Sequence, residues 1–253
     1  GNIYGFTRHP SCRIEEVIDF SASINPLGMS PRALRTIQEN LSRLVHYPDP
    51  DGMDLREALA QHHNLDVDRI FIGNGSTELI HLLPRALKWR RVLIPVPSFS
   101  EYEAAAETAG CEIEFMALPE ENHFQLCLPE ILKAIRREIG ALFLCNPNNP
   151  TGHLLSKSEL LPVLERAYQQ GTLVVLDEAF IDYAEEASMI PETRRYPHLI
   201  VLKSFTKFYA MPGLRVGYLV ASKEVTAQLE EIRNPWAVNH LAQVAATESL
   251  KDA

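Results

Sequence analysis

One lysine and one arginine, eight residues apart, have the types and spacing for cofactor chemistry. Lys207 follows an apolar run at residues 199–202, and Arg215 lies in a second strand-like run at residues 214–220. A lysine that leaves a strand and turns inward is desolvated, which lowers its pKa and supplies a neutral amine able to form a Schiff base. The guanidinium of an arginine binds phosphate oxygens through paired donors. A Schiff-base lysine with a phosphate anchor indicates pyridoxal phosphate.

The same residues have two other interpretations. Most lysines and arginines are solvated, and an arginine in a strand is often only paired with a carboxylate. Ser204 and Lys207 also have the S-x-x-K spacing of serine acyl-enzymes, which need an S-D-N and a K-T-G further along the chain. The sequence contains neither motif, so the cofactor hypothesis is favoured over the acyl-enzyme hypothesis.

Polar residues also follow other predicted strands. Ser76 and Thr77 open a helix after a glycine-rich turn that includes Gly75, where free amides and the helix dipole suit an anion. Helix capping is the commoner role of such residues. Asn149 lies in a turn, Asn-Pro-Asn-Asn-Pro-Thr-Gly, that begins directly after a strand and is fixed by its prolines.

Asp177 directly follows a very apolar predicted strand, at residues 172–176. A carboxylate in this position costs desolvation energy unless it meets a cation. The pattern fits a Walker-B aspartate, but no G-x-x-x-x-G-K-[ST] occurs in the chain, which excludes the nucleotide-hydrolase hypothesis. A protonated pyridine nitrogen fits better as the partner of Asp177, because the carboxylate keeps that ring cationic and able to accept electrons.

Short apolar runs alternate with amphipathic helices along the chain, which predicts an α/β fold with a mostly parallel sheet and helices on both faces. Ligands in such sheets bind beyond the carboxyl ends of the strands. We predict strands at residues 18–21, 70–72, 92–96, 112–116, 141–145, 172–176, 199–202 and 214–220. Helices are predicted at residues 31–44, 53–63, 101–109, 129–139 and 157–169, with a further helix that ends near residue 87.

The composition of the chain argues against several kinds of partner and site. The chain of 253 residues is 46% hydrophobic and 23% charged, with a net charge of −9, so nucleic acid is not an expected partner. Four separated cysteines without a C-x-x-C indicate reduced thiols in the cytoplasm and no metal site (Cys12, Cys111, Cys127 and Cys145). No apolar run is long enough to span a membrane, and no signal-like segment opens the chain. Because it starts without Met and stops in a helical pattern, we expect that both ends have been cut back.

With Asn149, Asp177, Lys207 and Arg215 in this order, the chain resembles fold-type I pyridoxal-phosphate-dependent enzymes of the class I/II aminotransferase group, over essentially its whole length. Within the group it is most similar to the threonine-phosphate decarboxylases, with the histidinol-phosphate aminotransferases as near relatives. The closer match rests on residues 20–29 (FSASINPLGM), 177–182 (DEAFID), 204–213 (SFTKFYAMPG) and 235–239 (PWAVN).

The resemblance implies a role for each matching residue. Lys207 forms the Schiff base with the cofactor, Asp177 pairs with the pyridine nitrogen, Asn149 reaches the phenolic oxygen, and Phe99 stacks on the ring. The residues implied for the cofactor phosphate are Gly75, Ser76, Thr77, Ser204, Thr206 and Arg215. Tyr47 would reach the cofactor phosphate of a neighbouring subunit, which implies a homodimer. Asn25 and Asn149 are assigned to the substrate, a small phosphorylated amino acid.

The resemblance also suggests a reaction. Many aminotransferases of the group have a tyrosine three residues after the aspartate; here it is Phe180, as in the decarboxylases. The expected function is therefore decarboxylation of L-threonine O-3-phosphate to (R)-1-amino-2-propanol O-2-phosphate in cobalamin biosynthesis. The alternatives are an aminotransferase acting on histidinol phosphate and a protein that kept the fold as a binding or regulatory module. The retained Lys207, Asp177 and Arg215 favour an enzyme, since a binding module needs no Schiff-base lysine.

Three regions are expected from the same resemblance. Residues 1–30 form an N-terminal arm, residues 31–238 a cofactor-binding large domain, and residues 239–253 the start of a truncated C-terminal small domain. In the resembled enzymes that small domain carries an arginine that grips the substrate carboxylate, and it is missing from this chain.

Overall fold

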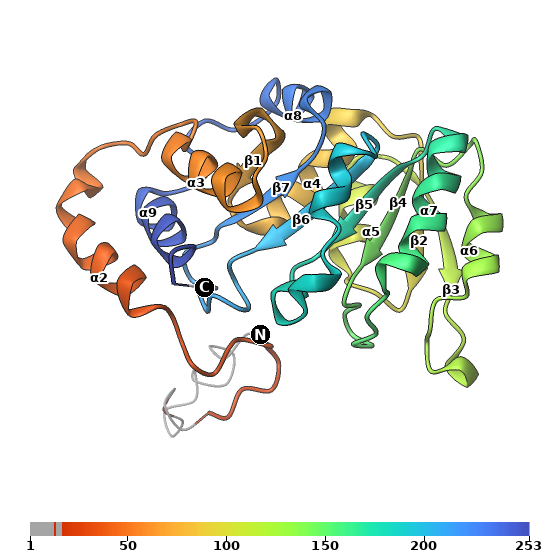
Figure 1. The fold of residues 1–253 in the computed structure, drawn as a ribbon, viewed down its shortest axis with the longest axis horizontal. Helices are drawn as coiled ribbons and strands as arrows, with labels where there is room; N and C mark the ends of the chain where they lie inside the picture. The colour runs from red at the N-terminus through yellow and green to blue at the C-terminus, as the bar shows by residue number, and fades with distance from the viewer. Residues whose placement is uncertain (1–12, 14–16, 253) are drawn as a thin grey trace.

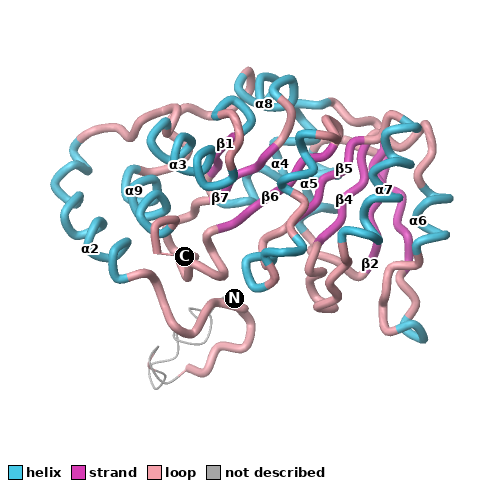
Figure 2. The backbone as a smooth tube through the Cα atoms, viewed as in Figure 1, coloured by secondary structure: helices cyan, strands magenta, loops and turns pink. Residues whose placement is uncertain are grey.

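The computed structural model describes residue 13 and residues 17–252, and it places one seven-stranded sheet at the centre (Figures 1 and 2). The strands lie in the order β1-β7-β6-β5-β4-β2-β3. Their bounds are β1 (Ile70–Gly73), β2 (Arg91–Val96), β3 (Glu112–Ala117), β4 (Ala141–Cys145), β5 (Leu173–Asp177), β6 (Leu199–Ser204) and β7 (Gly217–Val220).

The sheet is mixed but mostly parallel, as the sequence predicts. Strands β3, β2, β4, β5 and β6 pair in parallel, whereas β7 is antiparallel to both of its neighbours, β6 and β1. The register places Cys145 of β4 opposite Asp177 of β5, and Asp177 opposite Leu202 of β6. The carboxyl ends of three neighbouring strands therefore meet at one edge, and the antiparallel β7 starts at that same edge.

Helices cover both faces of the sheet (Figure 1). Helices α3 (Met53–His63), α6 (Leu128–Ala134), α7 (Lys157–Gln170) and α9 (His240–Ser249) supply the hydrophobic core on one face. Helices α4 (Gly75–Leu87), α5 (Glu101–Thr108) and α8 (Lys223–Glu230) supply the core on the other. Because side chains of a strand alternate between faces, Ile70 and Ile72 join the first core and Phe71 the second.

Local sequence signals account for individual helix ends. Helix α7 begins with a capping box, in which the Ser156 side chain accepts from the Glu159 amide and the Glu159 carboxylate accepts from the Ser156 amide. It ends at Gly171, whose φ of 74° suits a residue without a Cβ. Helix α2 (Pro31–Asn40) lies at one end of the molecule and packs against α9 (Figure 1).

Four predicted elements differ from the structure. Residues 18–21 form no strand, since they pair with no other strand and leave Ile18 82% and Phe20 95% exposed. The helix predicted at residues 31–44 continues after Asn40 as a 3₁₀ turn (Leu41–Val45). The helix predicted at residues 129–139 ends at Ala134, because the chain then turns so that Ile135 and Ile139 are both buried in the core. The predicted strand at residues 214–220 begins only at Gly217.

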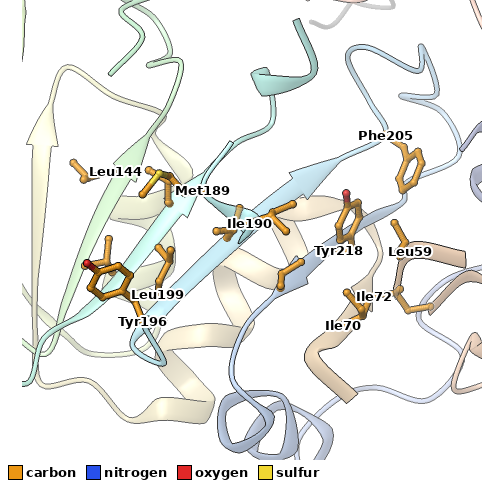
Figure 3. Packing of buried hydrophobic residues seen from close by; sticks show 14 of the residues in the cluster. Leu59, Ile70, Ile72, Leu144, Met189, Ile190, Tyr196, Leu199, Phe205 and Tyr218 are labelled. Carbon is orange, nitrogen blue, oxygen red and sulfur yellow. The ribbon is translucent and has the colours of Figure 1, made fainter. Parts of the chain in front are cut away.

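A half-buried histidine at the end of α3, His63, contacts the first core through Tyr218. Figure 3 shows Tyr218 beside Leu59, and the Tyr218 hydroxyl lies 2.7 Å from Nε2 of His63. Burial lowers the pKa of His63 to about 3, with smaller contributions from the charges of His62 and Lys203. A neutral imidazole is therefore part of the folded structure.

We expect His63 to destabilise the fold in acid. Its pKa is lower in the folded chain than in the unfolded chain, so its contribution is fully present above pH 6.5 and is lost as the pH falls towards 3. Allowing for partial exposure, the loss is on the order of 3 kcal/mol. Replacing His63 by Gln should flatten this part of the stability curve, measured by urea unfolding at pH 7 and pH 4. The exposed neighbour gives a control, His62→Gln, which should keep most of the wild-type slope because burial, the main cause of the lowered pKa of His63, is unchanged. Equal slopes for wild type and His63→Gln would contradict the prediction.

Candidate active site

A cleft of about 260 Å³ opens at the carboxyl edge of the parallel strands. It brings together nine of the residues that the sequence assigns to a cofactor: Ser76, Thr77, Phe99, Asn149, Asp177, Ser204, Thr206, Lys207 and Arg215. They come from the ends of β4, β5 and β6, from the start of α4, and from the segments before β7 and after β2. Residues up to 139 positions apart thus share one cleft.

The residues at one end of the cleft are suited to bind an anion. Ser76 and Thr77 lie in the first turn of α4, whose amides have no partner within the helix. Across from them, the Ser204 hydroxyl donates to Oγ1 of Thr206 at 2.9 Å and accepts from the Thr206 amide. Gly75 leaves room at this end, because a Cβ there would collide with the Arg215 guanidinium. Hydroxyls, free amides and a guanidinium together suit a phosphate group.

Arg215 contributes to this end of the cleft, but its backbone conformation differs from the strand that the sequence predicts. It precedes β7 in a left-handed conformation, with φ of 57°, and it is exposed rather than buried within a strand. Its Nη1 donates to the carbonyl oxygen of Pro212 at 3.3 Å. A left-handed conformation is unfavourable for a residue with a side chain and is found where the surrounding structure imposes it. The turn directs the guanidinium towards Gly75 instead of along the sheet.

The other end of the cleft holds a buried carboxylate. Asp177 is 3% exposed, and it accepts hydrogen bonds from the Tyr102 hydroxyl at 2.7 Å and from the Ala179 amide at 3.0 Å. Burial raises the pKa of Asp177, while both hydrogen bonds and the charge of Lys207 act to lower it. Such a group is stabilised further by a cation placed beside it in the cleft.

Lys207 also lines the cleft, three residues beyond β6, and it is near enough to both Arg215 and Asp177 to feel their charges. It is half-buried, with Nζ 5.4 Å from the centre of the Phe180 ring. Burial lowers the pKa of Lys207, as does the nearby charge of Arg215, and Asp177 opposes both. The direction agrees with the prediction from the sequence, and it increases the fraction of neutral amine available for attack on a carbonyl carbon.

In the asparagine-rich turn, two of the asparagine side chains hold the backbone and one lines the cleft. Asn146 bonds the backbone of Leu155 twice, and Asn148 donates to the Pro97 carbonyl oxygen at 3.1 Å. Asn149 alone of the three lines the cleft.

Three predicted site residues are not among those that line the cleft: Asn25, Tyr47 and Gly75, the last of which borders Arg215. Asn25 lies behind it, where its amide nitrogens donate to the carbonyl oxygens of Lys207 at 3.0 Å and Phe208 at 2.9 Å. It therefore supports the loop that carries Lys207, and its assignment to the substrate stays a prediction. Tyr47 is 81% exposed and packs its ring on Trp236, at 4.8 Å between centroids. Its predicted reach to a neighbouring subunit also stays a prediction.

Tyr102 and Cys145 are cleft residues that the sequence analysis missed. The signal for Tyr102 is its spacing, one helical turn after Phe99, which places both rings on the same side of the chain. The signal for Cys145 is its position as the last residue of a buried strand next to Asp177. Burial raises the pKa of Cys145 to about 12, so it is a neutral thiol.

Two other kinds of site are not found in the part of the chain that the structure describes. Residue 13 and residues 17–252 contain no group of three or more His, Cys, Asp or Glu side chains able to hold a metal ion. Over the same residues, no helix is both long enough and apolar enough to cross a membrane. Cys12 lies outside the described residues.

The cleft fits pyridoxal 5′-phosphate at each of its ends. The phosphate needs donors, the ring nitrogen needs an acidic partner, and the aldehyde needs an amine; the cleft offers all three. A mostly parallel sheet with this donor set at its carboxyl edge defines a pyridoxal-phosphate-dependent enzyme of fold type I.

Comparison with known proteins agrees with the geometry. The family profile of aminotransferase class I and II matches residues 15–253, and the chain belongs to this family. It is 43% identical over 241 residues to a threonine-phosphate decarboxylase of Salmonella typhimurium, which covers 94% of this chain and 66% of the relative. It is 36% identical over 244 residues to a histidinol-phosphate aminotransferase of Shouchella clausii, covering 94% and 65%.

The fold is shared with solved structures of the same family. The crystal structure of histidinol-phosphate aminotransferase from Sinorhizobium meliloti, in complex with pyridoxal 5′-phosphate, matches with a TM-score of 0.82 and 25% identity over 91% of this chain and 63% of that one. Pyridoxal 5′-phosphate is the cofactor of the family. The chain spans slightly less than two thirds of the length of the curated relatives it matches.

Proposed function

We propose that the protein containing this chain decarboxylates L-threonine O-3-phosphate to (R)-1-amino-2-propanol O-2-phosphate, a step of cobalamin biosynthesis. The observation that carries the proposal is Phe180: its phenyl ring lines the cleft beside Lys207, where many aminotransferases of the group would offer a tyrosine hydroxyl. The higher identity to a threonine-phosphate decarboxylase, 43% against 36%, supports the same choice. We place the enzyme in the cytoplasm and, from the expected reach of Tyr47, as a homodimer.

In this proposal each end of the cleft holds one part of the cofactor. Hydroxyl, amide and guanidinium donors hold the phosphate, from Gly75, Ser76, Thr77, Ser204, Thr206 and Arg215. Asp177 keeps a proton on the pyridine nitrogen, Phe99 covers one face of the ring, and Asn149 donates to the phenolic oxygen. When bound, the cofactor supplies an aldehyde for covalent attachment to an amine and a ring that accepts the electron pair released when a bond at Cα breaks.

Lys207 carries the proposed covalent and proton-transfer roles. Its lowered pKa makes the amine available to hold the cofactor and, after an amino acid has displaced it, to hold or deliver a proton at Cα. Whether CO₂ or a proton would be lost from Cα would depend on the orientation in which the protein holds the substrate. We propose that the substrate is held by Asn25 and Asn149 from this chain and by the expected C-terminal small domain, which begins near residue 239.

A direct assay tests the reaction. The full-length gene product, loaded with pyridoxal 5′-phosphate, is given O-phospho-L-threonine without a keto acid. Release of CO₂ and formation of 1-amino-2-propanol phosphate in equal amounts is the expected result. Absence of CO₂, together with glutamate-dependent amination of imidazole-acetol phosphate, would instead establish the aminotransferase alternative.

A further inference from the structure

A tyrosine of α5, Tyr102, forms a hydrogen bond with the buried carboxylate of Asp177. Tyr102 is 0% exposed, and its hydroxyl donates to Oδ2 of Asp177, while the Ala179 amide donates to Oδ1. Both carboxylate oxygens therefore carry a donor from the protein itself. Since Asp177 stands at the end of β5 and Tyr102 comes from a different element, this hydrogen bond fixes how the carboxylate faces the cleft.

The ring of Tyr102 is held as firmly as its hydroxyl. It stacks on Phe143 with centroids 5.1 Å apart and planes at 14°, and it meets Phe99 edge to face at 5.7 Å and 83°. Phe99 itself lines the cleft. The same side chain therefore contacts both the carboxylate at one end of the cofactor site and the aromatic ring expected against the cofactor face.

The protonation states of the two side chains make Tyr102 the donor and Asp177 the acceptor in their hydrogen bond. Burial, followed by the neighbouring Asp177 charge, raises the pKa of Tyr102 well above its usual value, so the hydroxyl remains a donor at neutral pH. Burial raises the pKa of Asp177, and the hydrogen bond from Tyr102 is the largest influence that opposes this rise. Without the hydroxyl, Asp177 would take up a proton at a higher pH.

We propose that Tyr102 is a positioning residue for the cofactor, holding the Asp177 carboxylate towards the pyridine nitrogen and Phe99 against the ring. The inference rests on the proposed role of Asp177. It adds a residue that acts through Asp177 and does not itself react.

The test is a hydroxyl deletion, Tyr102→Phe, made in the full-length protein, which keeps the ring contacts with Phe143 and Phe99. We expect pyridoxal 5′-phosphate to bind about tenfold more weakly, because a hydrogen bond to a charged group is lost. Cofactor affinity should also decline at low pH, and the absorbance of the bound cofactor measures this decline. In Tyr102→Phe the decline should begin at a pH about one unit higher than in wild type. In an Asp177→Asn background the same deletion should change the affinity little, since the charge through which it acts is gone.

A second tyrosine provides the matched control. Tyr196 is also buried, and its hydroxyl donates to the Glu165 carboxylate at 2.6 Å. Figure 3 shows its ring beside Leu199, the first residue of β6, and Tyr196 is not among the residues that line the cleft. Tyr196→Phe should leave cofactor affinity and its pH dependence at wild-type values.

Three outcomes would overturn the inference. Wild-type binding and pH dependence in Tyr102→Phe would remove the positioning role while leaving the cofactor site intact. An equal loss of affinity in the Asp177→Asn background would show that Tyr102 acts through packing alone. Failure of the wild-type protein to attach the cofactor at Lys207 would overturn the proposed function together with this inference, so the two failures are distinguishable.

Discussion

Replacing Lys207 by alanine is expected to abolish covalent attachment of pyridoxal 5′-phosphate. Among the described residues, Lys207 is the lysine that lines the cleft, and the nearby Lys203 is buried and donates to Asp182 at 2.6 Å. The Lys203 amine is therefore engaged in a buried ion pair and does not reach the cleft. Lys207 has a lowered pKa and lines the cleft.

The measurement is borohydride reduction of the loaded protein, followed by digestion and mass spectrometry of the lysine-bearing peptides. Wild type should carry one pyridoxyl group, on Lys207, and Lys207→Ala should carry none. Lys207→Arg keeps the positive charge and should also carry none, which separates covalent attachment from the charge of the cleft. Lys223→Ala removes an exposed lysine that pairs with Asp66 and Asp68, and it should label like wild type. Pyridoxyl-lysine in reduced Lys207→Ala protein would refute the assignment.

Replacing Gly217 by alanine is expected to destabilise the fold and to damage the anion end of the cleft at the same time. Gly217 begins β7, and a Cβ there would lie 2.6 Å from the Ser76 amide nitrogen and 2.9 Å from the Lys203 carbonyl oxygen. Both are backbone atoms that cannot rotate away, so either β7 or the first turn of α4 must move. We expect a loss of about 3 kcal/mol in the free energy of unfolding.

The affinity for pyridoxal 5′-phosphate should fall with it, because the amides at the start of α4 would move relative to the Arg215 guanidinium. Urea unfolding and cofactor titration by absorbance measure the two effects. Gly213→Ala is the control, since a Cβ at Gly213 meets nothing within 4 Å, and it should behave like wild type in both measurements. Equal stability and affinity in the two variants would show that β7 tolerates a side chain at this position.

Most of the site could be predicted from the sequence because its residues stand where predicted elements end. Asp177, Asn149 and Ser204 are placed by three apolar runs that are parallel strands in the structure, and parallel strands bring their carboxyl ends to one edge. Tyr47 and Asn25 could not be placed in this way. Tyr47 is expected to act on another subunit, and Asn25 lies in a segment that forms neither a helix nor a strand.

The sequence by itself determined the α/β class and the cofactor, because these follow from hydrophobic periodicity and from the chemistry of its residues. The assignment of Lys207 to that cofactor stays a prediction. Tertiary structure decided the reversed direction of β7, the left-handed turn at Arg215, and the pairing of Tyr102 with Asp177 across 75 residues. These features depend on how elements pack against one another. No local pattern encodes such packing, because each contact joins residues that are distant in the chain.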